Sequence, residues 1–138
     1  MLDWRMFDHS QSNIFVLNWF VTGVAAMKFK GILLNVSFLR VEGMALFPFI
    51  LVRKKPCSRF LINHEQIHLQ QQLELGLIVF YIWYFAEYLV RLIQYKKHFL
   101  AYLHISFERE AYQHQGDLDY LRKRPLWAFW GYLKQKKT

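Results

Sequence analysis

Two apolar runs in the first half of the chain have the composition of β-strands. Residues 32–41 and 45–53 are rich in β-branched and aromatic side chains and are separated by three residues that include Gly43, so the pattern predicts a β-hairpin over 32–53. Pro48 in the second run favours an edge strand or a bulge, because proline has no N–H for a sheet. An edge strand there would leave residues 46–51 open to an extended peptide.

From residue 58 the pattern changes to helical. Residues 58–97 predict a helix with several polar residues, which continues into or is followed by a strongly apolar helix. Residues 100–124 predict a second long helix, which Pro125 ends or redirects. Residues 126–138 form a basic, aromatic tail with helical spacing of Leu126, Trp127, Trp130 and Leu133. The chain is therefore expected to form one α+β domain, mainly α.

The apolar helix gives the strongest indication of contact with a membrane. Residues 75–93 contain only two charged residues, Glu87 and Arg91, which are four apart and are predicted to pair. The uninterrupted apolar part, residues 75–86, is short for a full span and suits a buried or interfacial helix better. Its tyrosines and tryptophan suit the headgroup region. We expect a helix that lies in the membrane surface.

Composition and charge are consistent with that contact. Of the 138 residues, 54% are hydrophobic and 19% aromatic, and the formal net charge is +8, which favours an anionic membrane surface as partner. A well-packed aromatic core with a basic solvated surface explains the same numbers. Nucleic acid is not an expected partner, because the basic residues lie in small clusters without a recognised nucleic-acid motif.

The N-terminal part and the single cysteine bear on localisation. Residues 1–30 contain an apolar segment, but residues 1–12 are polar, so no secretory signal is expected. Cys57 is the only cysteine, which excludes an internal disulfide and fits a reducing compartment. We therefore expect a membrane-associated protein at the cytoplasmic face, with a cytoplasmic protein as the alternative.

The most specific chemical signal is the H-E-x-x-H motif of residues 64–68, which apolar residues surround. On a helix, His64 and His68 share one face, where both imidazoles can bind one Zn²⁺. Glu65 then lies beside the metal without binding it, in the position of a general base that takes a proton from a zinc-bound water. A polar helix start capped by Asn63 or Ser58, with two surface histidines, is the alternative.

A catalytic zinc needs a third protein ligand. Residues 105–112 predict a helix with Ser106 as a candidate cap, on which Glu108 and Tyr112 share a face. Glu108 is the first candidate for the ligand, and Glu110, two residues on, is its rival. The ordinary alternative for Glu110 is a surface carboxylate that pairs with a neighbouring basic residue.

Two other metal arrangements fit parts of the sequence. A cluster on the second helix alone would combine a histidine, His104 or His114, with one of the two glutamates. A di-iron site also uses the spacing of Glu65 and His68, but it needs a second Glu-x-x-His pair, which the sequence does not contain. Both arrangements are therefore weaker than a mononuclear zinc site.

With its H-E-x-x-H motif and the later sequence Glu108-Arg109-Glu110-Ala111, the chain resembles a family, the integral-membrane gluzincin peptidases. This family includes prenyl-protein endopeptidases, heat-shock membrane endopeptidases and beta-lactam sensor proteases, and it pairs H-E-x-x-H with E-x-x-A-D. The resemblance implies a zincin-like domain in which Glu108 is the third zinc ligand. Tyr112 stands where the family has an aspartate that orients a ligand histidine, and a phenol is a weaker acceptor than a carboxylate.

The function that follows is peptide-bond hydrolysis at a membrane surface. His64, His68 and Glu108 would bind Zn²⁺, Glu65 would activate the water, and Tyr112, or Tyr102 in its place, would stabilise the oxyanion. The main alternative is a non-catalytic binding or assembly module of a larger envelope or secretion complex that retains the motif. A soluble enzyme acting on a non-peptide amide or ester is a third possibility. The chain also resembles short bacterial zincin-like proteins with the same two motifs, which implies no function.

Overall fold

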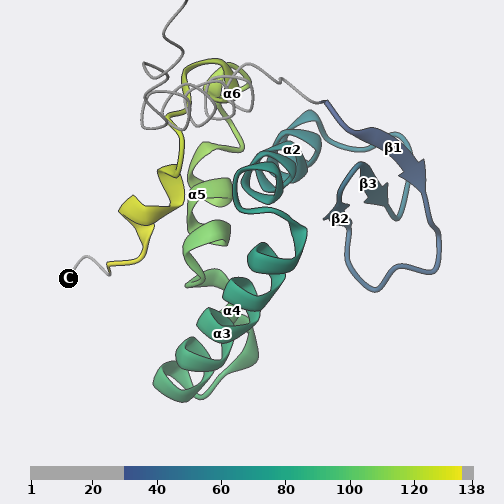
Figure 1. Ribbon diagram of the computed structural model, residues 1–138. Helices are drawn as coiled ribbons and strands as arrows, with labels where there is room; N and C mark the ends of the chain where they lie inside the picture. Colours follow the sequence, from purple (N-terminus) through teal and green to yellow (C-terminus); the bar gives the residue numbers. More distant parts are fainter. Residues whose placement is uncertain (1–29, 135–138) are drawn as a thin grey trace, which may run out of the picture.

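The computed structural model describes residues 30–134 (Figure 1), which form an α+β fold that is mainly helical. The predicted N-terminal apolar segment, apart from Lys30, and the basic end of the tail lie outside this part. A small sheet consists of β1 (Ile32–Asn35), β2 (Gly43–Leu46) and β3 (Phe49–Val52). The α+β class with its helical majority agrees with the sequence prediction.

The strand boundaries correct the predicted hairpin. The strand order is β1-β3-β2, with β1 parallel and β2 antiparallel to β3. The hairpin therefore joins β2 to β3 and turns at Phe47 and Pro48, so Pro48 lies between strands and removes no hydrogen bond from the sheet. β3 is the central strand, so the predicted edge strand over 46–51 was wrong for all but Leu46, the last residue of β2. In the described part of the chain, the edge strands of this sheet are β1 and β2.

Gly43 explains why the turn was misplaced. It was assigned to the turn, but it is the first residue of β2. A Cβ atom at this position would lie 2.7 Å from Oε1 of Glu65 and 3.0 Å from Cδ1 of Leu61. The glycine is needed because a helix approaches the strand closely, and this reason for glycine in a strand does not show in the local sequence.

Two consecutive helices occupy the segment 58–97, which is one of the two predicted arrangements. α2 (Arg59–Leu75) begins where the hydroxyl of Ser58 accepts a hydrogen bond from the N–H of Phe60, so of the two candidate caps Ser58 is the cap and Asn63 lies inside the helix. α2 ends at Gly76, which has φ of 77°, a value that favours glycine. α3 (Leu77–Tyr95) follows at once and contains the predicted ion pair, with 3.0 Å between Nη2 of Arg91 and Oε1 of Glu87.

The second long helix, predicted over 100–124, was wrong. Three shorter helices occupy this range, α4 (His98–Leu103), α5 (Ser106–His114) and α6 (Tyr120–Lys123). Ser106 does not cap α5, because its N–H and Oγ both donate to the carboxylate of Glu87, at 3.0 and 2.6 Å. Glu87 thus places a carboxylate at the N-terminus of α5, where the helix dipole favours negative charge, and the sequence gives no local sign of this contact.

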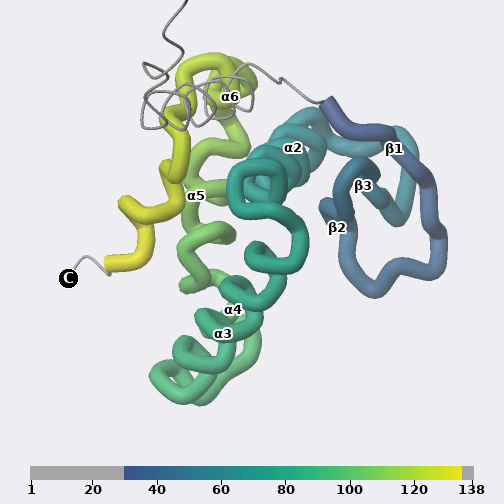
Figure 2. The backbone as a smooth tube through the Cα atoms, viewed as in Figure 1, coloured from purple at the N-terminus to yellow at the C-terminus, as the bar shows by residue number. Residues whose placement is uncertain are grey.

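The helices are arranged around α2. α2 lies between the sheet on one side and α5 on the other, while α3 and α4 run side by side away from the end of α2 (Figure 2). Leu69 of α2 packs on Ile50 and Val52 of the sheet, and Ile67 packs on Ala111 of α5. The two contacts use opposite faces of α2, so the sheet and α5 pack on either side of this helix.

The C-terminal segment is a short 3₁₀ helix, η1 (Ala128–Tyr132), which packs on α5. Phe129 is fully buried, whereas Trp127 and Trp130 are exposed. The predicted tail is therefore anchored by one aromatic side chain and presents two others to its surroundings.

Candidate metal centre

α2 supplies two histidines and a glutamate to one buried position. His64, Glu65 and His68 are each 5% exposed, so the alternative of a solvated helix start with surface histidines is excluded by the structure. Their polar groups are buried because α5 and the strand β2 cover this part of α2.

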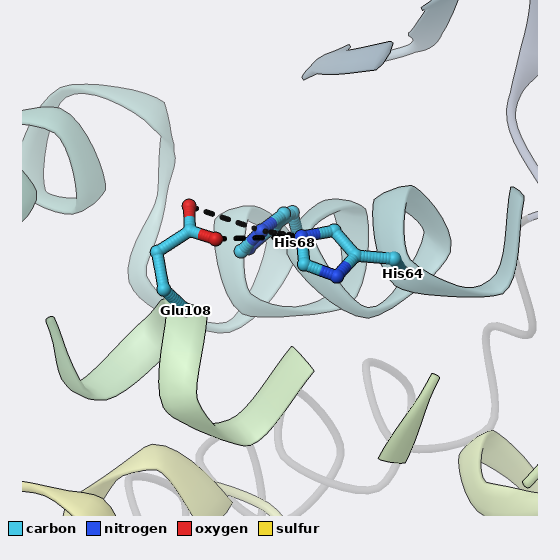
Figure 3. A group of neighbouring side chains, drawn as sticks. All are labelled: His64, His68 and Glu108. Carbon is cyan, nitrogen blue, oxygen red and sulfur yellow. Dashed lines mark hydrogen bonds and ion pairs between the residues drawn. The ribbon is translucent and has the colours of Figure 1, made fainter. Parts of the chain in front are cut away.

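Glu108 reaches the same position from α5. Its carboxylate points toward the imidazole rings of His64 and His68 (Figure 3). Asn63 holds the end of α5 on α2, because its Nδ2 donates to the carbonyl oxygens of Gln115 and Asp117 at 2.9 and 3.1 Å. The two helices are thus tied together by a side chain adjacent to the first histidine.

The distances between the three side chains are those of ligands that share one ion. Nε2 of His64 lies 3.1 Å from Nε2 of His68. The carboxylate oxygens of Glu108 lie 3.4 Å from Nε2 of His64 and 3.4 Å from Nε2 of His68. Two atoms bound to zinc at 2.0–2.1 Å and at the tetrahedral angle lie about 3.3 Å apart. The three side chains therefore lie close enough together to hold one metal ion.

A buried oxygen atom without a hydrogen bond supports the same interpretation. Among the described residues, Oε2 of Glu108 is buried and accepts no hydrogen bond, a costly condition for a carboxylate oxygen. Oε1 of the same carboxylate accepts a hydrogen bond of 2.7 Å from the hydroxyl of Tyr84. Two histidines and one carboxylate form a donor set typical of catalytic zinc. A cation among these side chains would satisfy the free oxygen.

The electrostatics of the cluster show what happens without a cation. Burial opposes charge on His68, but the adjacent carboxylate of Glu108 outweighs it and raises the pKa of His68 to about 9. Burial also opposes charge on Glu108, yet the two histidines lower the pKa of that carboxyl well below its usual range. At neutral pH the metal-free cluster therefore carries a proton on His68 opposite an ionised Glu108.

Glu65 lies beside the three candidate ligands and outside their set. Burial raises the pKa of its carboxyl, although the nearby histidines and a hydrogen bond from the backbone of Ala45 act against this effect. A carboxylate with a raised pKa in a largely water-free position is a suitable general base near neutral pH.

The four side chains open into a cavity of about 330 Å³. Its walls are mostly apolar and aromatic, and they come from β2 with the loop before it and from α3. The cavity therefore combines a few polar groups with an apolar wall, which is the usual composition of a small binding site. Its lining residues beyond the metal cluster include Val41, Met44, Phe80, Tyr81, Tyr84 and Tyr102.

The two tyrosines considered for the oxyanion lie in different places. Tyr102 lines the cavity. Tyr112 packs the edge of its ring on His64, with 4.6 Å between ring centroids, and its hydroxyl lies 3.4 Å from that of Tyr102. Tyr81 and Tyr84, which the sequence did not single out, also line the cavity. The phenols that line it are thus Tyr81, Tyr84 and Tyr102, and Tyr112 is not among them.

The rival ligand Glu110 has a different environment. It is fully buried and forms an ion pair with Arg124, so the expectation of a surface carboxylate was wrong. His114 stacks on Tyr120 with 3.7 Å between ring centroids, and His104 lies against Tyr95. In the described part of the chain, none of these three candidates belongs to the cluster of His64, His68 and Glu108. Likewise Cys57 packs against the core of the sheet.

Several polar residues around the centre were missed by the sequence analysis. Gln71 contacts His68, Gln72 donates to the carbonyl oxygen of Ala45 at 3.0 Å, and Arg124 pairs with Glu110 and Glu74. The two glutamines occur in a run of three, where nothing distinguishes them from residues on a solvated face. Burial of Gln71 and Gln72 follows only from the packing of α2 between the sheet and α5.

Comparison of the chain with models of protein families, with curated proteins and with solved structures finds no match. Arguments about function therefore rest on the residues and geometry of the chain itself.

We predict that the affinity for zinc rises with pH between about 7 and 9. The pKa of His68 is about 9 in the metal-free protein, so zinc must displace its proton, and the apparent affinity should increase about tenfold per pH unit and level off above pH 9. Titration of the protein with Zn²⁺ by calorimetry in buffers of different ionisation enthalpy measures the released proton. Binding at pH 7 without proton release would contradict this assignment.

Proposed function

We propose that the chain is a zinc-dependent metallopeptidase with a minimal zincin-like domain. The observation that carries this proposal is the cluster of His64, His68 and Glu108 at ligand distances, with Glu65 beside it and a cavity in front of all four. The match of the two motifs to the gluzincin pattern supports it. In this proposal Glu108, and not Glu110, is the third ligand.

The residues of the chain divide the chemistry among them. When bound, zinc supplies a Lewis acid that polarises a carbonyl group and makes water more acidic. Glu65 accepts a proton from the attacking water and returns it to the leaving amine nitrogen, so that no charged amine anion has to leave. The hydroxyl of Tyr102, which lines the cavity, would donate a hydrogen bond to the oxygen that becomes negative, because the hydroxyl of Tyr84 already donates to Glu108.

The walls of the cavity indicate the kind of substrate. Met44, Phe80 and Tyr81 provide apolar surface next to the polar cluster, so the side chain bound there is expected to be apolar or aromatic. Ala45 is held over α2 because its carbonyl oxygen accepts hydrogen bonds from Gln72 and Tyr81 at 3.0 and 3.3 Å. β2 thereby forms a fixed wall. The proposed substrate is a peptide or protein segment with an apolar residue near the cleaved bond.

Hydrolysis by purified, zinc-loaded protein tests the proposal. A library of quenched fluorescent peptides is offered at pH 7, and cleavage sites are determined by mass spectrometry. The proposed function predicts cleavage next to apolar residues, loss of cleavage after treatment with a zinc chelator, and recovery on addition of Zn²⁺. Cleavage that survives complete removal of the metal would exclude this mechanism.

We further propose that the protein works on a membrane surface, with α3 as its contact. α3 is the one helix in residues 30–134 that is long and apolar enough to cross a membrane, and only 17% of its apolar window is buried. A core helix of similar composition would be mostly buried. The only two charged side chains of α3, Glu87 and Arg91, point inward and pair with each other, so its exposed side is free of charge.

The exposed side of α3 is continuous along the helix. Ile78, Ile82 and Ile93 are 77%, 65% and 76% exposed, and we call this surface, together with Phe85 and Leu89, the α3 face. Trp130 lies beside the helix, with 5.5 Å between its ring and that of Trp83. Tryptophan is typical of the headgroup region. A helix lying in the surface of the bilayer would bury the α3 face in lipid.

We predict that charge on the α3 face abolishes membrane binding. The double variant Ile78→Glu/Ile82→Glu should bind vesicles of phosphatidylcholine and phosphatidylserine at least tenfold more weakly than the unchanged protein, because each buried isoleucine contributes about 1.5–3 kcal/mol. Leu118→Glu is the matched control, since Leu118 is exposed but lies far from α3, next to α6. Sedimentation with vesicles measures binding. An unchanged protein that stays in the supernatant and forms dimers would show that a second copy covers this face.

A further inference from the structure

A buried hydrogen-bond network lies behind His68, on the side away from the cavity, and the proposed chemistry does not use it. Gln71 is fully buried, and its Oε1 lies 2.8 Å from Nδ1 of His68. The Nε2 atom of Gln71 lies 3.2 Å from the carbonyl oxygen of Phe107 and 3.1 Å from Oε2 of Glu110. Gln71 therefore connects a candidate zinc ligand to the N-terminal part of α5.

The neighbours of Gln71 fix which end of its amide faces the histidine. A carbonyl oxygen and a carboxylate only accept hydrogen bonds, so the group near Phe107 and Glu110 must be the NH₂ of the amide. Arg124 donates to the carboxylate of Glu110 from the other side, which favours its acceptor form. A flipped amide would place its oxygen against two acceptors. The oxygen of Gln71 therefore faces His68.

The orientation of the amide determines the tautomer of His68. Because the oxygen of Gln71 can only accept, Nδ1 of His68 must carry the hydrogen. A neutral imidazole with its hydrogen on Nδ1 has a lone pair on Nε2. Nε2 is the atom that lies next to His64 and Glu108. The hydrogen bond thus presents the correct nitrogen of His68 to a metal.

We propose that Gln71 is the positioning residue of the metal centre: it holds His68 with a hydrogen on Nδ1 and the Nε2 lone pair toward the metal, while Glu110 and Arg124 hold Gln71. This inference rests on the zinc site of the proposed function. It also gives Glu110 a role, since a buried carboxylate two residues from a ligand otherwise has no part in the chemistry.

Tyr112, which stands where the gluzincin motif has an aspartate, makes other contacts in this chain. Tyr112 touches His64 through its ring, and its hydroxyl faces Tyr102. A polar contact to the second histidine comes instead from α2 itself, three residues after His68. The contact between Gln71 and His68 cannot be predicted from the sequence, because the orientation of the Gln71 amide is set by Phe107 and Glu110, which lie more than thirty residues away in the chain.

The variant Gln71→Met tests the inference, with Gln70→Met as its matched control. Methionine has a similar shape and offers the Nδ1–H of His68 only a thioether sulfur, which is a weak acceptor. Gln70 is half-buried on the same helix, and its side-chain contact is a long one of 3.4 Å to Glu74. Competition with a chromophoric chelator measures the Kd for Zn²⁺. Gln71→Met should weaken zinc binding about 10–100-fold, and Gln70→Met should change it less than threefold.

A spectroscopic readout separates positioning from a general loss of stability. In Co²⁺-loaded protein, the Nδ1 hydrogen of His68 gives a shifted proton NMR signal that persists in water only if its hydrogen bond slows exchange. The signal should be present in the unchanged protein and lost in Gln71→Met. Gln71→Glu should keep the signal and most of the zinc affinity, because a carboxyl oxygen at this position can still accept the Nδ1–H of His68.

The outcomes distinguish this inference from the proposed function. If the unchanged protein binds zinc and Gln71→Met keeps both the affinity and the slowly exchanging signal, the role of Gln71 is overturned and the zinc site stands. If the folded, unchanged protein binds no zinc, the proposed function is overturned, and the positioning role with it.

Discussion

Glu65→Gln is expected to lower kcat for peptide hydrolysis by about 10²–10⁴-fold, the usual contribution of a general base. Glutamine keeps the shape of the side chain but cannot accept a proton from water. Because Glu65 lies beside the candidate ligands and is not one of them, the variant should retain one zinc per chain and an unchanged zinc affinity to within about threefold.

A control variant separates this effect from a simple change of charge. Glu42→Gln removes one carboxylate from the surface, where Glu42 pairs with Arg53 and is 62% exposed, and it should leave kcat unchanged. Steady-state hydrolysis and metal analysis of both variants decide the matter. Full activity in Glu65→Gln would mean that the cleavage does not come from this site, and a non-catalytic binding or assembly module would then be the better account of the chain.

Arg124→Met is expected to lower the free energy of unfolding by about 3–5 kcal/mol. Arg124 pairs with both Glu74 and Glu110, and all three side chains are at most 2% exposed. Methionine leaves two buried carboxylates without a counter-charge, and the loss of a partner for a buried charge is among the most destabilising changes in a protein. Urea denaturation followed by circular dichroism measures the difference.

Arg122→Met provides the comparison for that variant. Arg122 lies two residues earlier, is 71% exposed and pairs only with Asp119 in the described part of the chain. A surface pair of this kind contributes at most about 1 kcal/mol, so the variant should unfold almost as the unchanged protein does. Equal stability of the two variants would show that Arg124 is not the counter-charge of the buried carboxylates.

The parts of the structure that sequence could predict are those set by short-range pattern. The spacing of His64 and His68 predicts a shared helix face, and the hydroxyl of Ser58 predicts the start of α2, and both are found. Glu87 and Arg91 are four residues apart on an apolar helix, so their pairing followed from helix geometry. These features depend on residues within about one turn of each other.

The features that were missed depend on contacts between distant segments. A glycine occupies position 43 of β2 because the side chain of Glu65 approaches the strand there. The start of α5 at Ser106 is held by hydrogen bonds to Glu87 of α3. Ser106 was a candidate cap, but the pattern of 100–124 otherwise favours a continuous helix as far as Gly116, so the break before Ser106 was not part of the predicted long helix. Likewise, burial selects Gln71 from a run of three glutamines.

The two histidines of the candidate site were predicted from the sequence, whereas the residues around the site were not. Sequence left Glu108 and Glu110 both open, and the structure separates them by direction: one faces the two histidines, and the other faces Arg124. On a helix, residues two apart point to different sides, so only the rotation of α5 relative to α2 could decide between them.

Metal content of the purified protein tests the central claim most directly. Elemental mass spectrometry is applied to the unchanged chain and to His64→Ala, Glu108→Ala and Glu110→Gln, with circular dichroism to confirm that each is folded. The account predicts about one zinc per chain, lost in His64→Ala and Glu108→Ala and kept in Glu110→Gln. A folded, unchanged protein that holds no zinc after Zn²⁺ is offered at neutral pH would contradict it.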